Sequence, residues 1–105
     1  MKIRYLAAAA ALSVSAAALA AGDGEILFRQ NNCGACHVAA GKSVGPALTD
    51  IAAKYRGDKG AQAGLETKVR NGGSGSFGSM PMPATARSIS DGDIRTMVAW
   101  LLSQK

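Results

Sequence analysis

Two cysteines and a histidine stand together in the segment Cys33-Gly34-Ala35-Cys36-His37, and the chain contains no other residue of either type. On a helical turn, side chains at positions i and i+3 lie on the same face. Two sulfurs placed in this way can form thioethers with the two vinyl groups of one porphyrin, and the imidazole that follows can bind the iron. This spacing is the attachment pattern of a c-type haem.

Three other roles fit this pair of cysteines less well. A structural zinc site takes four ligands, drawn mostly from Cys and His, and the chain offers only Cys33, Cys36 and His37. A redox-active Cys-x-x-Cys pair follows a strand in a βαβ unit, and no strand pattern precedes Cys33. A simple disulfide is the third alternative. We expect haem attachment, which consumes both thiols.

The first 20 residues have the pattern of an export signal. An uncharged Ala-rich run follows Lys2 and Arg4, and Ala18-Leu19-Ala20 is a small-x-small cleavage site. The run is short and weakly apolar for a membrane span, which needs about 20 residues; an uncleaved anchor is the alternative. We predict that residues 1–20 are a cleaved signal peptide, that residues 21–105 form one monohaem domain, and that this domain resides in the bacterial periplasm.

The charge of the chain and its predicted compartment limit the functions that it can have. The chain carries a formal charge of +5, and removal of Lys2 and Arg4 leaves ten Lys and Arg against seven Asp and Glu, a charge of +3. Neither a basic run nor an aromatic stripe accompanies this charge, so we do not expect nucleic-acid binding. The positive residues are interpreted as a solvated face that can include a docking patch. Because an oxidising compartment would pair two free thiols, covalent haem attachment fits the predicted export.

Hydrophobic spacing predicts an all-α domain of about four helices that position the motif. A first helix, capped by Gly22 or Asp23, leads to the cysteines, and helical stripes follow over residues 48–56 and 65–70. A last helix begins at Ser90 with a capping box and carries a stripe of apolar side chains: Ile94, Met97, Val98 and Leu101. We expect it to pack across the first helix. Gly24, on the packed face of the first helix, would let another helix approach closely.

Two loops offer partners to the imidazole and to the iron. Pro46 can place its carbonyl to accept a hydrogen bond from the His37 nitrogen that does not bind iron, which would fix the ring; equally, it can be a turn proline. A Gly-rich stretch leads to Met80-Pro81-Met82-Pro83. Thioether sulfur is a soft ligand that raises the reduction potential. Met82, restricted by a proline on each side, is the predicted sixth iron ligand, and Met80 is the alternative.

Taken in order, these segments resemble a small class I cytochrome c, most of all the cytochrome c-551 (c8) group. The resemblance covers residues 21–105 and rests on Gly24-x-x-x-Phe28, Cys33-x-x-Cys36-His37, Val44-Gly45-Pro46-Ala47, Ala52-Ala53-Lys54-Tyr55, Arg70-Asn71-Gly72, Met80-Pro81-Met82-Pro83 and Trp100-Leu101-Leu102-Ser103-Gln104-Lys105. It implies a class I cytochrome c fold, with about four helices wrapped around one covalently attached haem c.

The resemblance also implies roles for single residues. Cys33 and Cys36 would attach the haem, His37 and Met82 would bind its iron, and the Pro46 carbonyl would be the partner of His37. Lys68 falls where relatives place a basic residue near a haem propionate. Two positions depart from the pattern: Phe77 stands where relatives often carry tryptophan, and Thr85 where they carry asparagine.

An iron with two side-chain ligands has no open position for a substrate, so the chain is expected to be an electron carrier and not an enzyme. The expected partners are a bc1-type donor and a terminal reductase or oxidase, met by a monomer through small transient interfaces. The alternatives are a haem subunit of a larger oxidoreductase, or a haem sensor or enzyme with an open sixth site. In a four-helix cytochrome c′ the haem motif lies near the C-terminus, whereas Cys33 lies near the start of residues 21–105.

Overall fold

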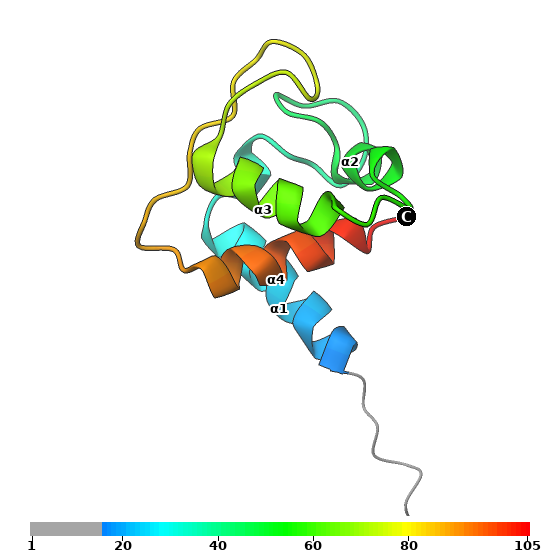
Figure 1. Ribbon diagram of the computed structural model, residues 1–105, viewed down its shortest axis with the longest axis vertical. Coiled ribbons are helices and arrows are strands. Elements are labelled where there is room, and N and C mark those ends of the chain that lie inside the picture. Colours follow the sequence, from blue (N-terminus) through cyan, green and yellow to red (C-terminus); the bar gives the residue numbers. More distant parts are fainter. Residues whose placement is uncertain (1–15) are drawn as a thin grey trace, which may run out of the picture.

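The computed structural model describes residues 16–105, which form an all-α fold. Its elements are α1 (Ala16–Gln30), the 3₁₀ turn η1 (Cys33–Ala35), α2 (Leu48–Lys54), α3 (Ala61–Asn71) and α4 (Asp91–Leu102) (Figure 1). The predicted all-α class with about four helices is thus confirmed. The proposed signal peptide lies mostly outside the described residues, so its cleavage stays a prediction. None of the helices in the described part of the chain is both long and apolar enough to cross a membrane.

Helix α1 begins before the residues predicted to cap it, so that Gly22 and Asp23 lie inside the helix. The residues upstream are mostly alanine, which has the highest intrinsic helix propensity, and the helix therefore continues through them. At its other end, the Asn31 side chain donates to the Leu27 carbonyl at 2.9 Å. Asn32 follows in the left-handed region, with φ of 60°, and turns the chain into the Cys33 segment.

Helices α1 and α4 cross in close contact, as predicted (Figure 1). A Cβ on Gly24 would lie 2.3 Å from the Trp100 Cβ and 2.7 Å from the Thr96 carbonyl oxygen. One turn along α1, the rings of Phe28 and Trp100 pack with their centroids 5.1 Å apart. The absence of a side chain at residue 24 therefore sets the distance between the first and last helices.

The hydrophobic core lies along α4. Ile94, Met97 and Val98 are buried, and partly buried side chains from α1, η1 and α3 pack against them. The predicted stripe of α2 is also buried at Leu48, Ile51 and Ala52. The N-terminus of α4 is capped as predicted, since the Ser90 hydroxyl accepts from the Asp93 N–H at 3.0 Å.

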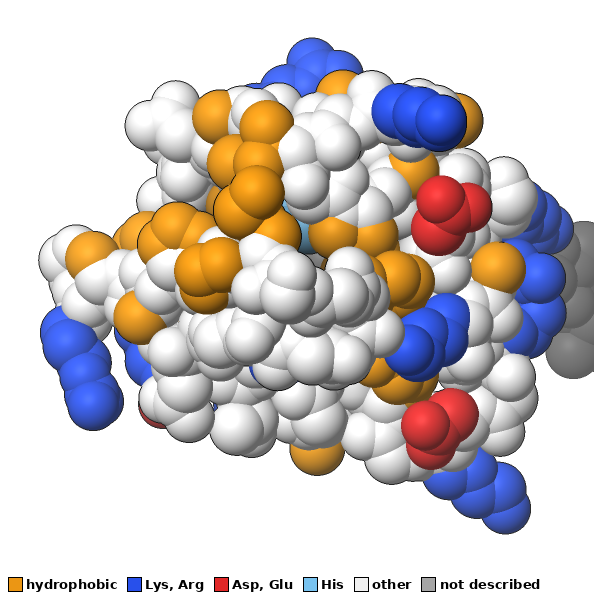
Figure 2. Space-filling view, turned by 90° about the horizontal axis from the view of Figure 1, so that it is seen from above, with side chains coloured by type: hydrophobic (Ala, Val, Ile, Leu, Met, Phe, Trp, Pro, Cys, Tyr) orange, Lys and Arg blue, Asp and Glu red, His pale blue; other side chains and the backbone are white. Residues whose placement is uncertain are grey.

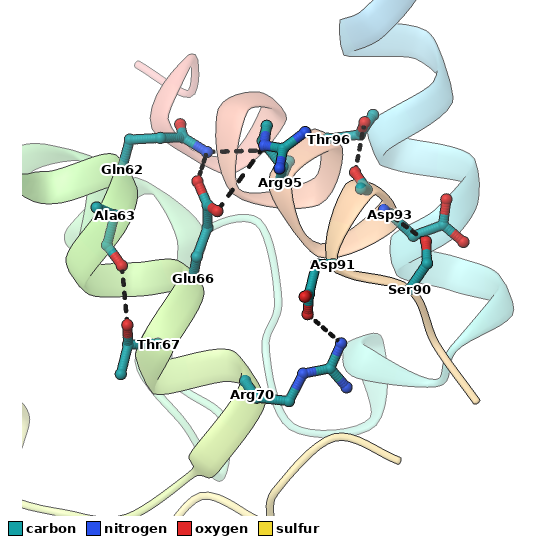
Figure 3. A network of polar contacts seen from close by, with 11 residues as sticks. Gln62, Ala63, Glu66, Thr67, Arg70, Ser90, Asp91, Asp93, Arg95 and Thr96 are labelled. Atoms are coloured by element: carbon teal, nitrogen blue, oxygen red, sulfur yellow. Dashed lines mark hydrogen bonds and ion pairs between the residues drawn. The ribbon is translucent and has the colours of Figure 1, made fainter. Parts of the chain in front are cut away.

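Polar contacts join α3 to the start of α4 (Figure 3). The Arg70 guanidinium donates to the Ala86 carbonyl at 3.0 Å, to the Ile89 carbonyl at 2.7 Å and to the Asp91 carboxylate at 2.7 Å. The hydrogen bond from Arg70 and its charge lower the pKa of the Asp91 carboxyl. The segment that follows the two methionines is thereby fixed to the helical frame.

Candidate haem-binding site

A cavity of about 630 Å³ opens between α2, α3 and the loop over residues 73–83. Its volume falls in the range of small-molecule and cofactor sites, about 300–1,000 Å³. Viewed from above, hydrophobic side chains gather over this face, with Lys and Arg side chains toward its margins (Figure 2). Of the six residues predicted to hold the haem, Cys33 is not among those that line the cavity, and the other five do line it: Cys36, His37, Pro46, Lys68 and Met82.

The His37 imidazole is oriented by the backbone of the following loop. Its Nδ1 lies 2.8 Å from the Pro46 carbonyl oxygen. Because a carbonyl oxygen only accepts hydrogen bonds, Nδ1 donates to it, and in the neutral imidazole Nε2 then keeps its lone pair. Gly45, the residue before Pro46, donates its N–H to the Cys36 carbonyl at 2.8 Å. The ring is thus presented with one nitrogen free to bind a metal.

The two cysteines lie at the two ends of one short turn and are not joined in a disulfide. Cys36 lines the cavity, and Cys33 packs against the core of Ile94, Met97 and Val98. The backbone N–H groups of Cys36 and His37 both donate to the Cys33 carbonyl, which closes the turn that carries the three residues. Burial raises the pKa of the Cys33 thiol above its ordinary value.

Met82 is held by its own backbone. Its N–H donates to the Gly73 carbonyl at 2.8 Å, and its carbonyl accepts from the Gly73 N–H at 2.9 Å, so the two residues form an isolated antiparallel bridge. Met80 also lines the cavity, but it lies in the loop beyond this bridge and is 66% exposed. Met82 is partly buried. The backbone therefore fixes Met82 more firmly than Met80.

Three further positions complete the account of the predicted site. Lys68 extends from α3 to the cavity wall, and its Nζ would lie 3.6 Å from a Cβ built on Gly73. Phe77 also lines the cavity. Thr85 is not among the described residues of the cavity wall; its N–H donates to the Arg70 carbonyl at 3.3 Å.

Two glycines have structural roles that the sequence did not reveal. A Cβ on Gly45 would lie 2.9 Å from the His37 Cε1, so the imidazole packs directly on the glycine backbone. Gly72 ends α3 with φ of 69°, and a Cβ there would lie 2.3 Å from the Met82 carbonyl oxygen. The available signals were the Gly45-Pro46 pair and the glycine that follows the last residue of a helix.

The donor set and the shape of the cavity fit a haem. A porphyrin needs a mostly apolar pocket, two thiols for its vinyl groups, and nitrogen or sulfur ligands for its iron. Cys36, His37 and Met82 line this cavity, and Cys33 lies at the other end of the turn that carries Cys36. The described residues contain no group of three or more His, Cys, Asp and Glu side chains that could together hold a metal ion. This result disfavours the alternative of a structural zinc site, which takes four ligands.

Comparison with known families identifies the chain. The family described as "Cytochrome c" matches residues 21–105. The chain belongs to the cytochrome c family. It is a class I c-type cytochrome of the c-551 (c8) group, and its cofactor is a covalently attached haem c.

Individual relatives agree with this assignment. The chain is 46% identical over 83 residues to cytochrome c-551 of Pseudomonas aeruginosa, which covers 79% of this chain and 78% of the relative. It is 41% identical to cytochrome c-552 of Nitrosomonas europaea over 105 residues, the full length of both. The crystal structure of Nitrosomonas europaea cytochrome c552 superposes with a TM-score of 0.72 at 43% identity, over 77% of this chain and 99% of that chain. The predicted class I cytochrome c fold is therefore confirmed.

Proposed function

We propose that this cytochrome is a soluble periplasmic electron carrier with a single haem c whose iron is bound by His37 and Met82. The haem supplies reversible one-electron chemistry at its iron. Cys33 and Cys36 hold it covalently, and Lys68 stands at the cavity wall as a cationic partner for a propionate. The proposed electron donor is a bc1-type complex and the acceptor a terminal reductase or oxidase.

One observation carries this proposal: His37 and Met82 line the same cavity, each fixed by backbone hydrogen bonds of its own segment. The Pro46 carbonyl leaves the His37 Nε2 available as a ligand. The bridge with Gly73 fixes the backbone from which the Met82 sulfur extends. Two such side chains, added to the porphyrin nitrogens, fill the coordination of iron. A filled site excludes substrate, which favours a carrier over an enzyme or a gas sensor.

The ligand assignment is tested with visible spectra of the purified ferric holoprotein. A methionine ligand gives a weak sulfur-to-iron charge-transfer band in the far red. We expect Met82→Ala to lose this band and to bind carbon monoxide readily when reduced. Met80→Ala is the matched control and should keep the band. A Met82→Ala protein that retains the band would transfer the ligand role to Met80, and a wild-type protein that binds carbon monoxide readily would refute the carrier.

The proposed location and partners need separate tests. Mass spectrometry of the periplasmic holoprotein should give a chain that begins at Ala21; a chain that retains residues 1–20 would contradict export with cleavage. Transient redox encounters bury little surface and weaken with salt. A pull-down from periplasm should therefore lose its redox partners as salt is raised. Stoichiometric co-purification at high salt would instead identify a subunit of a larger oxidoreductase.

A further inference from the structure

The loop that carries the methionines has few attachments to the rest of the polypeptide. At its base, Gly73 and Met82 pair through two backbone hydrogen bonds, and inside it the Gly75 N–H donates to the Gly78 carbonyl. Among the described residues, the only other hydrogen bond to residues 74–81 comes from Lys54. Within residues 16–105, Lys54 therefore supplies the one hydrogen bond that joins this loop to another element of the fold.

Lys54 contacts the loop in two ways. Its Nζ donates to the Ser76 carbonyl oxygen at 2.6 Å. The same ammonium lies 4.5 Å from the centroid of the Phe77 ring, within the range of a cation–π interaction. It also lies 5.8 Å from the ring of Tyr55, the next residue in the chain. One cation thus holds the backbone of one loop residue and the side chain of the next.

The backbone of Lys54 belongs to a packed helix, whereas the loop that it contacts is rich in glycine. Lys54 is the last residue of α2, whose Ile51 and Ala52 are buried. In the loop, Gly75 and Gly78 have φ of 113° and 105°, and glycine has more backbone freedom to lose than any other residue. A loop of this composition, tied only at its base, would sample many conformations. An attachment at its middle restricts them.

We propose that Lys54 is a positioning residue for the iron ligand: by binding Ser76 and Phe77 it holds the 74–81 loop in place and thereby slows the departure of the Met82 sulfur from the iron. This inference rests on the proposed role of Met82 as ligand. Lys54 does not line the cavity, and its contacts are with Ser76, Phe77 and Tyr55. It acts through the loop, and its loss raises the rate at which the loop opens.

The test uses the ferric holoprotein and imidazole, a neutral ligand that binds only after Met82 has left the iron. At saturating imidazole, the rate of ligand exchange reports loop opening. Because the cation–π contact and the hydrogen bond are both exposed to solvent, each contributes at the low end of its range, and we expect Lys54→Met to accelerate exchange by roughly threefold to tenfold. Lys54→Arg keeps the positive charge and the hydrogen-bond donors, and its exchange rate should stay within about twofold of the wild-type rate.

Lys59→Met is the matched control, because it removes the same charge from an exposed position in the turn after α2. It should exchange at the wild-type rate. The proposal is overturned if Lys54→Met exchanges no faster than Lys59→Met, or if Lys54→Arg is as fast as Lys54→Met. It is also overturned if the urea midpoint of Lys54→Met falls well below that of Lys59→Met, since the lysine would then stabilise the whole domain and not the loop.

A double variant tests the proposed route. If Lys54 acts partly through the Phe77 ring, then Phe77→Leu and Lys54→Met together should accelerate exchange by less than the product of their separate factors. If the acceleration of the double variant equals the product of the two separate factors, Lys54 does not act through the Phe77 ring. Failure of the ligand assignment is recognised separately: in that case the far-red band survives Met82→Ala in a protein with Lys54 intact.

Discussion

Replacement of Gly24 by alanine tests whether the crossing of α1 and α4 is set by the glycine. The added Cβ would lie 2.3 Å from the Trp100 Cβ and 2.7 Å from the Thr96 carbonyl oxygen. Ordinary van der Waals contact begins at 3.4 Å, so the two helices must separate by about 1 Å at this point. Neither obstructing atom belongs to the far end of a flexible side chain, and a rotamer change cannot relieve the contact.

The expected loss of unfolding free energy follows from the contacts between the two helices at this crossing. Overpacking in a rigid core costs about 1–3 kcal/mol, and separation of the helices also loosens Phe28 against Trp100. We expect Gly24→Ala to lower the free energy of unfolding by about 3 kcal/mol, toward the upper end of that range. A domain of this size has a total of roughly 4–13 kcal/mol. The variant should fold, with a markedly lower urea midpoint.

Urea unfolding of the holoprotein, followed by far-UV circular dichroism, measures this change. Gly22→Ala is the matched control, because it lies in the same helix and its added Cβ would meet nothing within 4 Å. Helix propensity alone should make it neutral or more stable by up to about 1 kcal/mol. A Gly24→Ala protein within about 0.5 kcal/mol of Gly22→Ala would refute the argument from close approach.

Two other predictions follow from the site and from the surface. Gly45→Ala places a Cβ 2.9 Å from the His37 Cε1. The ring must tilt, so we expect shifted His37 ring signals in NMR spectra and a loss of about 1–2 kcal/mol in unfolding free energy; Gly22→Ala, whose Cβ meets nothing within 4 Å, should leave the His37 signals unchanged. Asp91 has a pKa lowered by Arg70 from its ordinary value of 3.8, so its ionised form stabilises the fold above that pH, and the contribution disappears as pH falls through the lowered value. Asp91→Asn should therefore flatten the decline of the urea midpoint below about pH 4; an unchanged acid dependence would show that the Arg70 contact adds nothing measurable to stability.

Much of the fold was accessible from spacing alone. The stripe of Ile94, Met97, Val98 and Leu101 predicted the inward face of the last helix, and the first three of these are buried. Gly24 predicted a face of the first helix that another helix could approach closely. Both follow from the period of the α-helix and from the need to bury apolar side chains. The predicted start of α1 was wrong. Gly22 and Asp23 favour a helix start only weakly, and the alanines before them have a high helix propensity, so the helix begins earlier.

The site was predictable in its residue types but not in its supports. Cys33, Cys36 and His37 could be recognised from their spacing. Pro46 was predicted either to bind His37 through its carbonyl or to be a turn proline, and the 2.8 Å contact with His37 supports the first role. The bond from Lys54 to Ser76 joins residues 22 positions apart. Such a contact depends on where a helix ends relative to a loop, and no local pattern in the sequence encodes that distance.

The position of α4 has a consequence for the attachment of the cofactor. Cys33 and Phe28 pack against side chains of α4, which spans residues 91–102. The turn that carries the cysteines is therefore anchored at one end to a helix far away in the sequence. A substitution that separates α4 from α1 would loosen that anchor as well.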